Sequence, residues 1–313
     1  MLVAFPGQGV DPVDLGRLLT LHRHADLVER LADIVGITDL STIDLRATEV
    51  AQPCIFVASF LAAFTHFGAP LTWPHHESNS LAPSAEHPAS IGAVCGHSFG
   101  EIAALCFAGA ITPEAGLALV RQRAEWCQAE HARRPGTMVV VMRLDEHTVE
   151  WVRRISVSRY GGLLDWAVVN GPGQFVLSGD TTTATGALKE IEELGGVGRA
   201  LPIGGAYHSP LLAPVVPRYL AAVREAITVE PEVPLVSCTA NRALAHADEI
   251  AEAVARALVL PVSWPNTLRA AVSIGVTDAV DSGPGRTLAN LARFTPELPF
   301  DALSPDRRAT SPH

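Results

Sequence analysis

One short segment limits the folds open to this chain: Gly96-His97-Ser98-Phe99-Gly100, which has the pattern Gly-x-Ser-x-Gly. Residues 91–95 before it are apolar, like a buried strand, and residues 101–108 after it favour a helix. A serine on a sharp strand-to-helix turn presents its hydroxyl outward, and the flanking glycines let the backbone turn without a clash. This context predicts an α/β fold with Ser98 as a nucleophile; the alternative is a purely structural turn.

Composition narrows the class of protein. Of the 313 residues, 48% are hydrophobic and 18% are charged, which is typical of a globular protein with a large core. No stretch approaches the uninterrupted apolar length that crosses a bilayer, and the N-terminus lacks the basic and apolar regions of a secretory signal. The net charge of −10 argues against nucleic acid as the main partner. We therefore expect neither a membrane nor a nucleic-acid partner.

The five cysteines lie scattered in apolar segments without paired spacing. This favours reduced thiols in a cytoplasmic protein over a disulfide framework or a zinc site. Cys95 is close to Ser98, but its place on a strand favours packing in the core. Three histidines, His75, His76 and His87, lie in a polar segment rich in proline and serine. Because no regular ligand spacing relates them, solvated surface histidines are a better interpretation than a metal cluster.

The order of predicted elements divides the chain into two units. Strands and helices alternate up to about residue 136, and the alternation resumes at about residue 204. Between them, residues 137–203 have the order β-α-β-β-α-β of a ferredoxin-like unit. We predict a discontinuous α/β catalytic domain, residues 1–136 and 204–300, with an inserted ferredoxin-like subdomain, residues 137–203. Residues 301–313 are expected to form a flexible tail.

Further motifs occur in a fixed order along nearly the whole chain. Besides the serine turn they are Phe5-Pro6-Gly7-Gln8-Gly9, Gln52-Pro53, Arg123 with Gln128, Asn170-Gly171-Pro172-Gly173-Gln174, His208, Pro261-Val262-Ser263-Trp264 and Gly283-Pro284-Gly285. With these motifs the chain resembles the malonyl-CoA:acyl-carrier-protein transacylases and the discrete acyltransferases of polyketide synthases. The resemblance implies an α/β-hydrolase-like large domain. It also implies ping-pong transfer of a malonyl group from coenzyme A to the phosphopantetheine thiol of an acyl carrier protein.

A serine hydroxyl is a weak nucleophile near neutral pH and needs a base within hydrogen-bond reach. His97 lies beside Ser98, but its side chain is expected to point away from the turn. The resemblance assigns the base to His208. It also implies that a backbone carbonyl near Ser263 orients the imidazole, so that serine and histidine act as a dyad.

The oxyanion formed at the serine needs two N–H donors. A helix that begins just after Ser98 directs free N–H groups and partial positive charge toward this point. The resemblance assigns the two donors to the backbone N–H groups of Phe99 and Gln8. The alternative for the loop that contains Gln8 is a plain turn at the end of a strand.

Arg123 is the candidate for substrate selection. It lies among apolar residues of a predicted helix, where an arginine needs a carboxylate, and a substrate could supply one through a bidentate bond. The alternative is an arginine that extends to the surface, as Arg121 nearby can do. In the family that the chain resembles, the matching arginine binds the free carboxylate of the malonyl group. The resemblance adds four residues to the substrate-binding set: Gln52, Tyr207, Asn170 and Ser263.

The residues before His208 bear on the acyl group. Gly205-Ala206-Tyr207-His208 has an aromatic residue directly before the histidine, as malonyl-type members of the family tend to have. Methylmalonyl-type members tend to have a serine there and a tyrosine three positions before the histidine. Tyr207 replaces the more usual phenylalanine, and Ser263 replaces a bulkier polar residue, so an unusual extender unit stays open. A composition with one lysine favours a polyketide pathway, but fatty acid synthesis also stays open.

Carrier proteins are usually acidic, so docking to this acidic chain would need a local basic patch. Arg153, Arg154 and Arg159 cluster in the predicted insert, beside a cleft that the resemblance places between the two units. The alternative is a solvated helix face. Arg199 and Arg286 are the next candidates.

Two other functions stay open. The first is an acyl hydrolase that clears carrier proteins, against which Arg123 argues. The second is a non-catalytic module that binds carrier proteins, against which the intact Ser98 and His208 argue. Acyl transfer of this kind requires no metal and no bound cofactor, because the coenzyme A thioester is itself the substrate.

Overall fold

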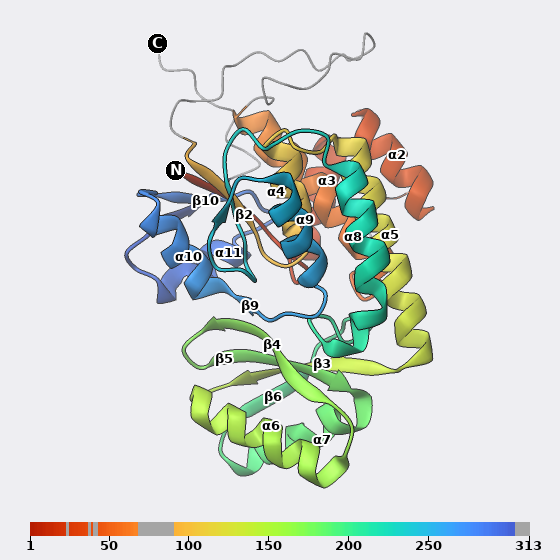
Figure 1. Cartoon of the computed structure of the whole chain (residues 1–313), viewed down its shortest axis with the longest axis vertical. Coiled ribbons are helices and arrows are strands. Elements are labelled where there is room, and N and C mark those ends of the chain that lie inside the picture. Colours follow the sequence, from red (N-terminus) through yellow and green to blue (C-terminus); the bar gives the residue numbers. More distant parts are fainter. Residues whose placement is uncertain (23–24, 37–38, 40–42, 68–90, 304–313) are drawn as a thin grey trace.

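The computed structural model describes residues 1–22, 25–36, 39, 43–67 and 91–303. These residues form two units, which lie one above the other in Figure 1. The large upper unit is built on a mostly parallel sheet, and the small lower unit on an antiparallel sheet with two helices beneath it. The fold is therefore mixed α/β, as predicted.

The large unit contains a six-stranded sheet with the order β11-β10-β1-β2-β7-β8. The first five strands run parallel, and β8 is antiparallel to β7. The central strands β1 and β2 are buried at every residue, as expected for parallel strands covered on both faces. The strands are β1 (Leu2–Phe5), β2 (Ala93–Gly96), β7 (Leu235–Val236), β8 (Ala243–Leu244), β10 (Ala279–Asp281) and β11 (Phe300–Ala302).

Helices cover both faces of this sheet. The Asp11 carboxylate accepts hydrogen bonds from the N–H groups at the start of α1, and the Thr112 hydroxyl accepts one at the start of α5. Each of these helices also has a proline in its first turn, where no N–H is needed. The unit contains α1 (Pro12–Leu21), α2 (Asp26–Val35), α3 (Thr48–Phe67), α4 (Gly100–Phe107), α5 (Pro113–Arg133), η1 (Pro210–Val215), α8 (Val216–Ala226), α9 (Ala247–Arg256), α10 (Trp264–Ser273), α11 (Thr287–Leu291) and η2 (Ala292–Phe294).

Helix α3 lies in the core of the large unit. By length and mean hydropathy, 1.5, it meets the criteria for a membrane span, which the sequence analysis did not expect. However, 72% of its apolar window is buried inside the protein, where α3 packs against α1, α2, α4 and α5. Packing in the core accounts for this composition. The helix begins at Thr48, so the Gln52-Pro53 motif lies inside it.

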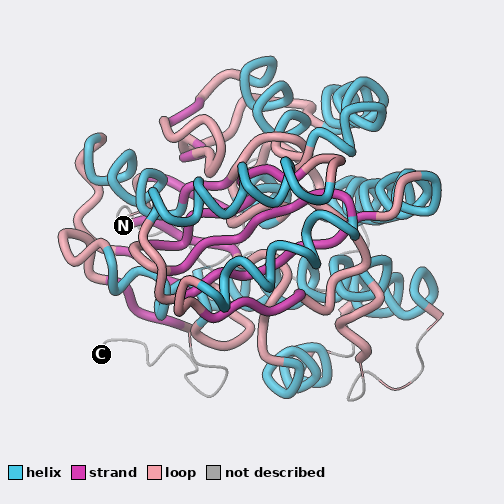
Figure 2. Tube along the Cα trace, turned by 90° about the horizontal axis from the view of Figure 1, so that it is seen from below, coloured by secondary structure: helices cyan, strands magenta, loops and turns pink. Residues whose placement is uncertain are grey.

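The small unit has the predicted β-α-β-β-α-β order, and its strands are arranged β6-β3-β5-β4, all antiparallel. Figure 2 looks onto this unit from below, and its two helices lie in front of the sheet. Asp145 caps the first of them by accepting a hydrogen bond from the Thr148 N–H. The elements are β3 (Gly136–Met142), α6 (Glu146–Tyr160), β4 (Leu164–Gly171), β5 (Gln174–Asp180), α7 (Thr181–Glu193) and β6 (Val197–Ala200).

The two faces of the small sheet have different partners. Val139 and Val141 pack against α6 and α7 in the core of the unit. Side chains alternate along a strand, so Met138 and Val140 face the opposite way, toward the large unit. The small sheet therefore forms one wall of the space between the two units.

Two strands cross the boundaries expected from the sequence. β9 (Val262–Ser263) comes from the large unit by sequence but pairs with β4 of the small sheet. β11 adds an edge strand to the large sheet, so residues 301 and 302, expected in the tail, are part of that sheet. β8 and α11 were also not predicted from the sequence. His75, His76, His87 and residues 304–313 lie outside the described residues.

Candidate active site

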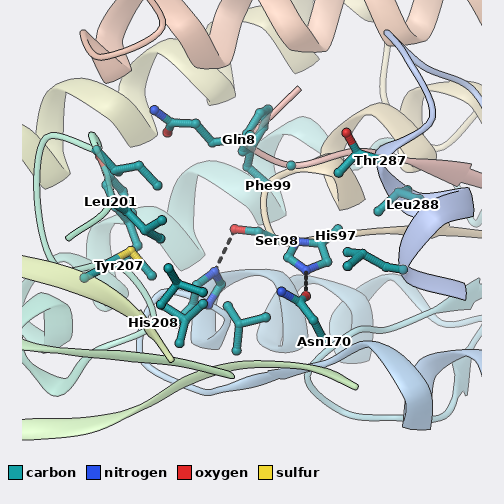
Figure 3. A pocket seen from close by; sticks show the side chains of 18 of the residues that line it. Gln8, His97, Ser98, Phe99, Asn170, Leu201, Tyr207, His208, Thr287 and Leu288 are labelled. Atoms are coloured by element: carbon teal, nitrogen blue, oxygen red, sulfur yellow. Dashed lines mark hydrogen bonds between the residues drawn. The ribbon is translucent and has the colours of Figure 1, made fainter. Parts of the chain in front are cut away.

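Ser98 lies on the turn between β2 and α4, with a φ of 58°. This left-handed value is uncommon for a residue with a side chain and persists only where the surroundings enforce it. The surroundings are tight, because a Cβ at Gly100 would overlap the carbonyl oxygens of Phe5 and Pro6 at the end of β1. As Figure 3 shows, the Ser98 side chain points into a cavity.

Ser98 and His208 are brought together from distant parts of the chain. The Ser98 Oγ lies 2.7 Å from the His208 Nε2 (Figure 3). The His208 Nδ1 lies 3.1 Å from the backbone carbonyl of Leu260. A carbonyl only accepts, so Nδ1 carries the proton and Nε2 is free to accept the serine hydroxyl proton. The pair has the geometry of a nucleophile with its base, oriented by a main-chain carbonyl.

His208 is a neutral base in this site. Burial above all, and then the positive charge of Arg123 and the neighbouring His97, together lower its pKa to about 3. The side chain is 2% exposed. Because the imidazole is unprotonated at neutral pH, it is in the form that can accept a proton when substrate binds.

Two backbone N–H groups close to Ser98 have no hydrogen-bond partner within the described ranges: those of Phe99 and Gln8. Phe99 is the N-cap of α4, and the Gln8 loop follows β1, which pairs directly with β2. Both residues line the cavity that Ser98 faces. An anion at this point would find free donors and the positive end of a helix.

The sequence predicted that the His97 side chain points away from the turn, and this prediction is wrong. The His97 ring lines the same cavity, and its Nε2 lies 3.3 Å from the Asn170 Oδ1 (Figure 3). Burial lowers the pKa of His97 to about 4, so the ring is neutral and its Nε2–H can donate to the amide oxygen. This contact joins the serine turn to β4 of the small sheet.

Arg123, on α5, is 3% exposed and has no carboxylate within ion-pair distance among the described residues. Its Nη1 donates to the Gln52 Oε1 at 2.8 Å, and its guanidinium lies 5.1 Å from the centre of the Tyr207 ring and 5.9 Å from that of Phe99. Arg123 itself does not line the cavity, but Gln52 and Tyr207, which cover it, do. A buried guanidinium without an anion is costly unless a ligand supplies one.

The cavity has a volume of about 230 Å³ and two kinds of wall. The polar wall surrounds Ser98 and His208. The apolar wall comes from the small sheet, the chain after β6, and α11. Its side chains are Met138, Val140, Val168, Val176, Leu201, Ile203, Leu288 and Leu291. The site therefore joins a polar reactive end to a channel suited to an aliphatic arm.

Ser263 lies outside this cavity, contrary to its expected place in the substrate-binding set. Its N–H donates to the carbonyl of Cys238, and it forms β9 and caps α10. The residue is engaged in joining the two sheets, because Ser263 pairs with Val169 of β4. Leu260, three residues earlier, provides the carbonyl that orients His208.

The expected docking arginines do not lie beside the cavity. They belong to α6, which covers the face of the small sheet opposite the cavity. Arg153 and Arg154 both pair with Glu150, and Arg159 pairs with Glu190. Their charge is therefore partly neutralised within the small unit. Residues 153, 154 and 159 fit a solvated helix face better than a surface facing the site.

Sequence reasoning missed the cavity-lining role of His97 and the apolar wall. Residues 138–142 are apolar without interruption, which favours a strand covered on both faces but does not show what either face contacts. All five cysteines are free and buried. Across the described ranges, no three His, Cys, Asp or Glu side chains are grouped closely enough to hold a metal ion.

Comparison with known proteins places this site in context. A family model described as "Acyl transferase domain" matches residues 88–289, well over half of the chain. The malonyl CoA-acyl carrier protein transacylase of Bacillus subtilis (strain 168) is 26% identical over 301 residues, which cover 92% of this chain and 88% of that protein.

Two further matches extend the comparison. The polyketide biosynthesis protein ThaF of Burkholderia thailandensis is 29% identical over 92% of this chain, which spans 24% of that longer protein. Among solved structures, a malonyl-transacylase in complex with a type II polyketide synthase acyl-carrier protein matches with a TM-score of 0.78. It is 25% identical to this chain, and the match covers 96% of this chain and 94% of that one.

Proposed function

The chain belongs to the acyl transferase domain family, and we propose that it transfers a malonyl group, or a related 3-carboxyacyl group, from coenzyme A to the phosphopantetheine thiol of an acyl carrier protein. One observation carries the choice of acyl group: Arg123 is buried behind the Ser98–His208 pair without a carboxylate partner in the described residues. Malonyl transfer and binding to a carrier protein are also what the names of similar proteins state for those proteins.

In the first half-reaction, the Ser98 Oγ attacks the thioester carbonyl while the His208 Nε2 takes its proton. The carbonyl oxygen becomes an oxyanion, which the N–H groups of Phe99 and Gln8 stabilise. When the tetrahedral intermediate collapses, the C–S bond breaks and the imidazolium returns its proton to the coenzyme A thiolate. A malonyl ester on Ser98 remains.

In the second half-reaction, the carrier protein's phosphopantetheine arm replaces coenzyme A in the apolar channel. His208 takes the proton of the incoming thiol, the thiolate attacks the ester, and the Ser98 Oγ leaves and regains the proton. Water must be kept from the ester meanwhile. The aliphatic wall from the small sheet supports this, because it leaves few polar groups that would hold a water molecule near the ester.

Arg123 would pair with the free carboxylate of the malonyl group. The Gln52 amide, whose Oε1 now accepts from Arg123 and whose Nε2 lies 3.4 Å from the Gln8 Oε1, would share or yield this contact. A charge-assisted bond to a buried guanidinium is among the stronger polar contacts in proteins. Tyr207 forms the wall beside it, and the Asn170 amide, hydrogen-bonded to His97, would face the pantetheine arm.

This chemistry requires no bound cofactor, since the thioester supplies an activated acyl group. We infer a cytoplasmic enzyme, where coenzyme A thioesters and carrier proteins occur, serving either fatty acid or polyketide synthesis. For docking, Arg199 is the better candidate once α6 is set aside. It is exposed on β6 and pairs in register with Val140, so both side chains lie on the face of the small sheet that forms the cavity wall.

Intact-mass spectrometry after incubation with acyl-coenzyme A thioesters tests the proposal. Malonyl-CoA should add one malonyl group on Ser98, and Ser98→Ala should remove the label while the protein stays folded. Holo carrier protein should then discharge the label as malonyl-carrier. Rapid release of free malonate without carrier would identify a hydrolase instead, and no acyl-enzyme from any thioester would identify a non-catalytic binding module.

A further inference from the structure

Behind the wall of the acyl site lies a buried histidine that the mechanism does not use. His131, in the last turn of α5, is 6% exposed, and neither of its ring nitrogens has a hydrogen-bond partner in the described structure. A buried polar group without a partner destabilises a fold, and an apolar side chain of similar size would fill the space without that cost. What the ring contacts therefore decides what it can do.

The ring of His131 is wedged against the chain that leads to His208. A Cβ at Gly205 would overlap the His131 ring, so residue 205 has no room for any side chain. Gly205 is held in place by its own N–H, which donates to the Ile203 carbonyl at 2.8 Å. The imidazole therefore cannot retreat on this side.

On its other side His131 meets Tyr207. The two ring centres are 5.2 Å apart, with the rings at 71° in an edge-to-face contact. Tyr207 lines the cavity beside Ser98, and the Arg123 guanidinium lies over its ring. Tyr207 thus contacts both the guanidinium and the imidazole, and the His131 ring occupies space into which Tyr207 could otherwise shift.

We propose that His131 is a specificity-determining positioning residue, which limits the size of the acyl group by holding Tyr207 against the acyl site. The inference rests on the proposed function, since it concerns the acyl group that Ser98 receives. With His131 in place, an unbranched 3-carboxyacyl group fits and a substituent on its α-carbon meets the Tyr207 ring. A neutral ring suits this role, and burial and the nearby Arg123 lower the pKa of His131 to about 4.

The test compares acyl groups within one enzyme. His131→Ala should leave space into which Tyr207 can shift, so the kcat/KM for methylmalonyl-CoA relative to malonyl-CoA should rise about 10-fold or more. A single methyl group in a closely fitting site typically changes kcat/KM by roughly 10–200-fold. His131→Phe restores an aromatic ring of similar thickness and should keep the wild-type ratio.

Two controls separate specificity from stability. His246→Ala removes a histidine whose side chain is 77% exposed, and it should leave the ratio unchanged. The thermal midpoint of each variant is measured in parallel. A loss of folded enzyme lowers both rates together, whereas a change in the ratio reports on the site itself.

The outcomes are distinct. If wild-type enzyme acylates Ser98 from malonyl-CoA and His131→Ala does not raise the ratio, the role of His131 is wrong while the proposed function stands. A raised ratio in His131→Phe as well would also overturn it, because filling the space would then not matter. If wild-type enzyme forms no acyl-enzyme from any thioester, the proposed function itself fails.

Discussion

At the scale of single residues, the site depends on keeping three histidine rings uncharged next to one arginine. His131 and His208 are buried and His97 is half-buried, and burial lowers the pKa of each below its usual range. The positive charge of Arg123 adds to this effect for His131 and His208. The arrangement leaves the guanidinium as the one cation in this cluster, so an incoming carboxylate has a single place to bind.

The lowered pKa of His208 predicts an unusual pH profile. A free imidazole is half protonated near pH 6.5, and below that pH a general base loses about tenfold in rate per pH unit. With the pKa of His208 at about 3, the base stays unprotonated well below neutrality. We expect the single-turnover rate of Ser98 acylation by malonyl-CoA to stay nearly flat from about pH 8 to about pH 5.

Circular dichroism across the same range confirms that the protein stays folded. An inflection near pH 6.5 in the acylation rate of folded enzyme would show that His208 titrates like an exposed histidine.

Arg123 makes a second prediction at this scale. Arg123→Ala should cost malonyl transfer about 2–4 kcal/mol in kcat/KM, because it removes a charge-assisted contact in a buried site. Acetyl transfer from acetyl-CoA should persist or improve, since an acetyl group has no free carboxylate to pair.

The matched control is Arg121→Ala on the same helix. Arg121 is half-exposed and pairs with Glu125 at 2.9 Å, so its loss should alter neither rate by much. Equal loss of malonyl and acetyl transfer in Arg123→Ala would mean that Arg123 acts as a structural residue.

At the scale of elements, a chain of hydrogen bonds links the nucleophile helix to the loop that orients the base. Glu101, in the first turn of α4, is 1% exposed, and its Oε1 accepts from the Cys238 N–H at 2.7 Å. The Cys238 carbonyl accepts from the Ser263 N–H at 3.0 Å. Ser263 is the N-cap residue of α10. It lies three residues after Leu260, whose carbonyl accepts the hydrogen bond from the His208 Nδ1. The two halves of the dyad are thus tied to one another behind the site.

Glu101→Ala should break this link. The substitution leaves the buried Cys238 N–H without an acceptor. We expect this loss to lower the free energy of unfolding by about 1–3 kcal/mol. We also expect kcat to fall by a larger factor than KM rises. Glu101→Gln keeps an acceptor and should retain most of the stability and most of the activity. Urea unfolding and steady-state kinetics of the two variants provide the measurement.

The pH dependence gives this prediction a sign. Burial raises the pKa of Glu101 to about 7, so the folded state holds its proton more tightly than the unfolded chain. The stability that Glu101 contributes is greatest at low pH and is lost as the pH rises toward 7. Glu101→Gln should therefore gain stability relative to wild type between about pH 5 and about pH 8. A difference that stays constant with pH would show that the carboxyl does not titrate in this range.

How much of these elements the sequence predicts depends on the range of the interaction. The strand–turn–helix at Ser98 follows from local patterns, and it was placed within a few residues. β9 could not be foreseen, because a two-residue strand exists only through its pairing with β4. The same limit applies to the site. The resemblance gave His208 and a carbonyl near Ser263, but that this carbonyl belongs to Leu260 depends on how residues 257–263 fold back.

At the scale of the whole molecule, the cavity is lined by both units, the large one and the small one that is inserted in its sequence. The large unit supplies Ser98 and His208, and the small sheet supplies much of the aliphatic wall. The position of the α6 arginines was misjudged for this reason: the sequence places them in the insert, but only the sheet's two-sided packing decides which face they occupy. We therefore expect a carrier protein to deliver its arm from the cavity side of the small sheet and not from the side that α6 covers.

The net charge of −10 makes docking of an acidic carrier unfavourable overall, so a small number of well-placed cations should have a large effect. Arg199 is exposed on the cavity side of the small sheet and has no carboxylate within ion-pair distance in the described part of the chain. Arg199→Glu should raise the KM for the holo carrier protein about fivefold or more and leave Ser98 acylation from malonyl-CoA much less affected. Arg154→Glu, on the far side of the sheet, is the matched control and should leave the carrier KM unchanged.

Salt should reproduce the same difference. Raising the ionic strength from about 0.05 M to about 0.5 M shortens the screening length below 10 Å and should weaken carrier transfer by wild-type enzyme. The Arg199→Glu variant should respond in the opposite direction, since salt screens a repulsion there. If Arg154→Glu raises the carrier KM and Arg199→Glu does not, the carrier approaches across α6 and reaches the cavity from the other side of the small sheet.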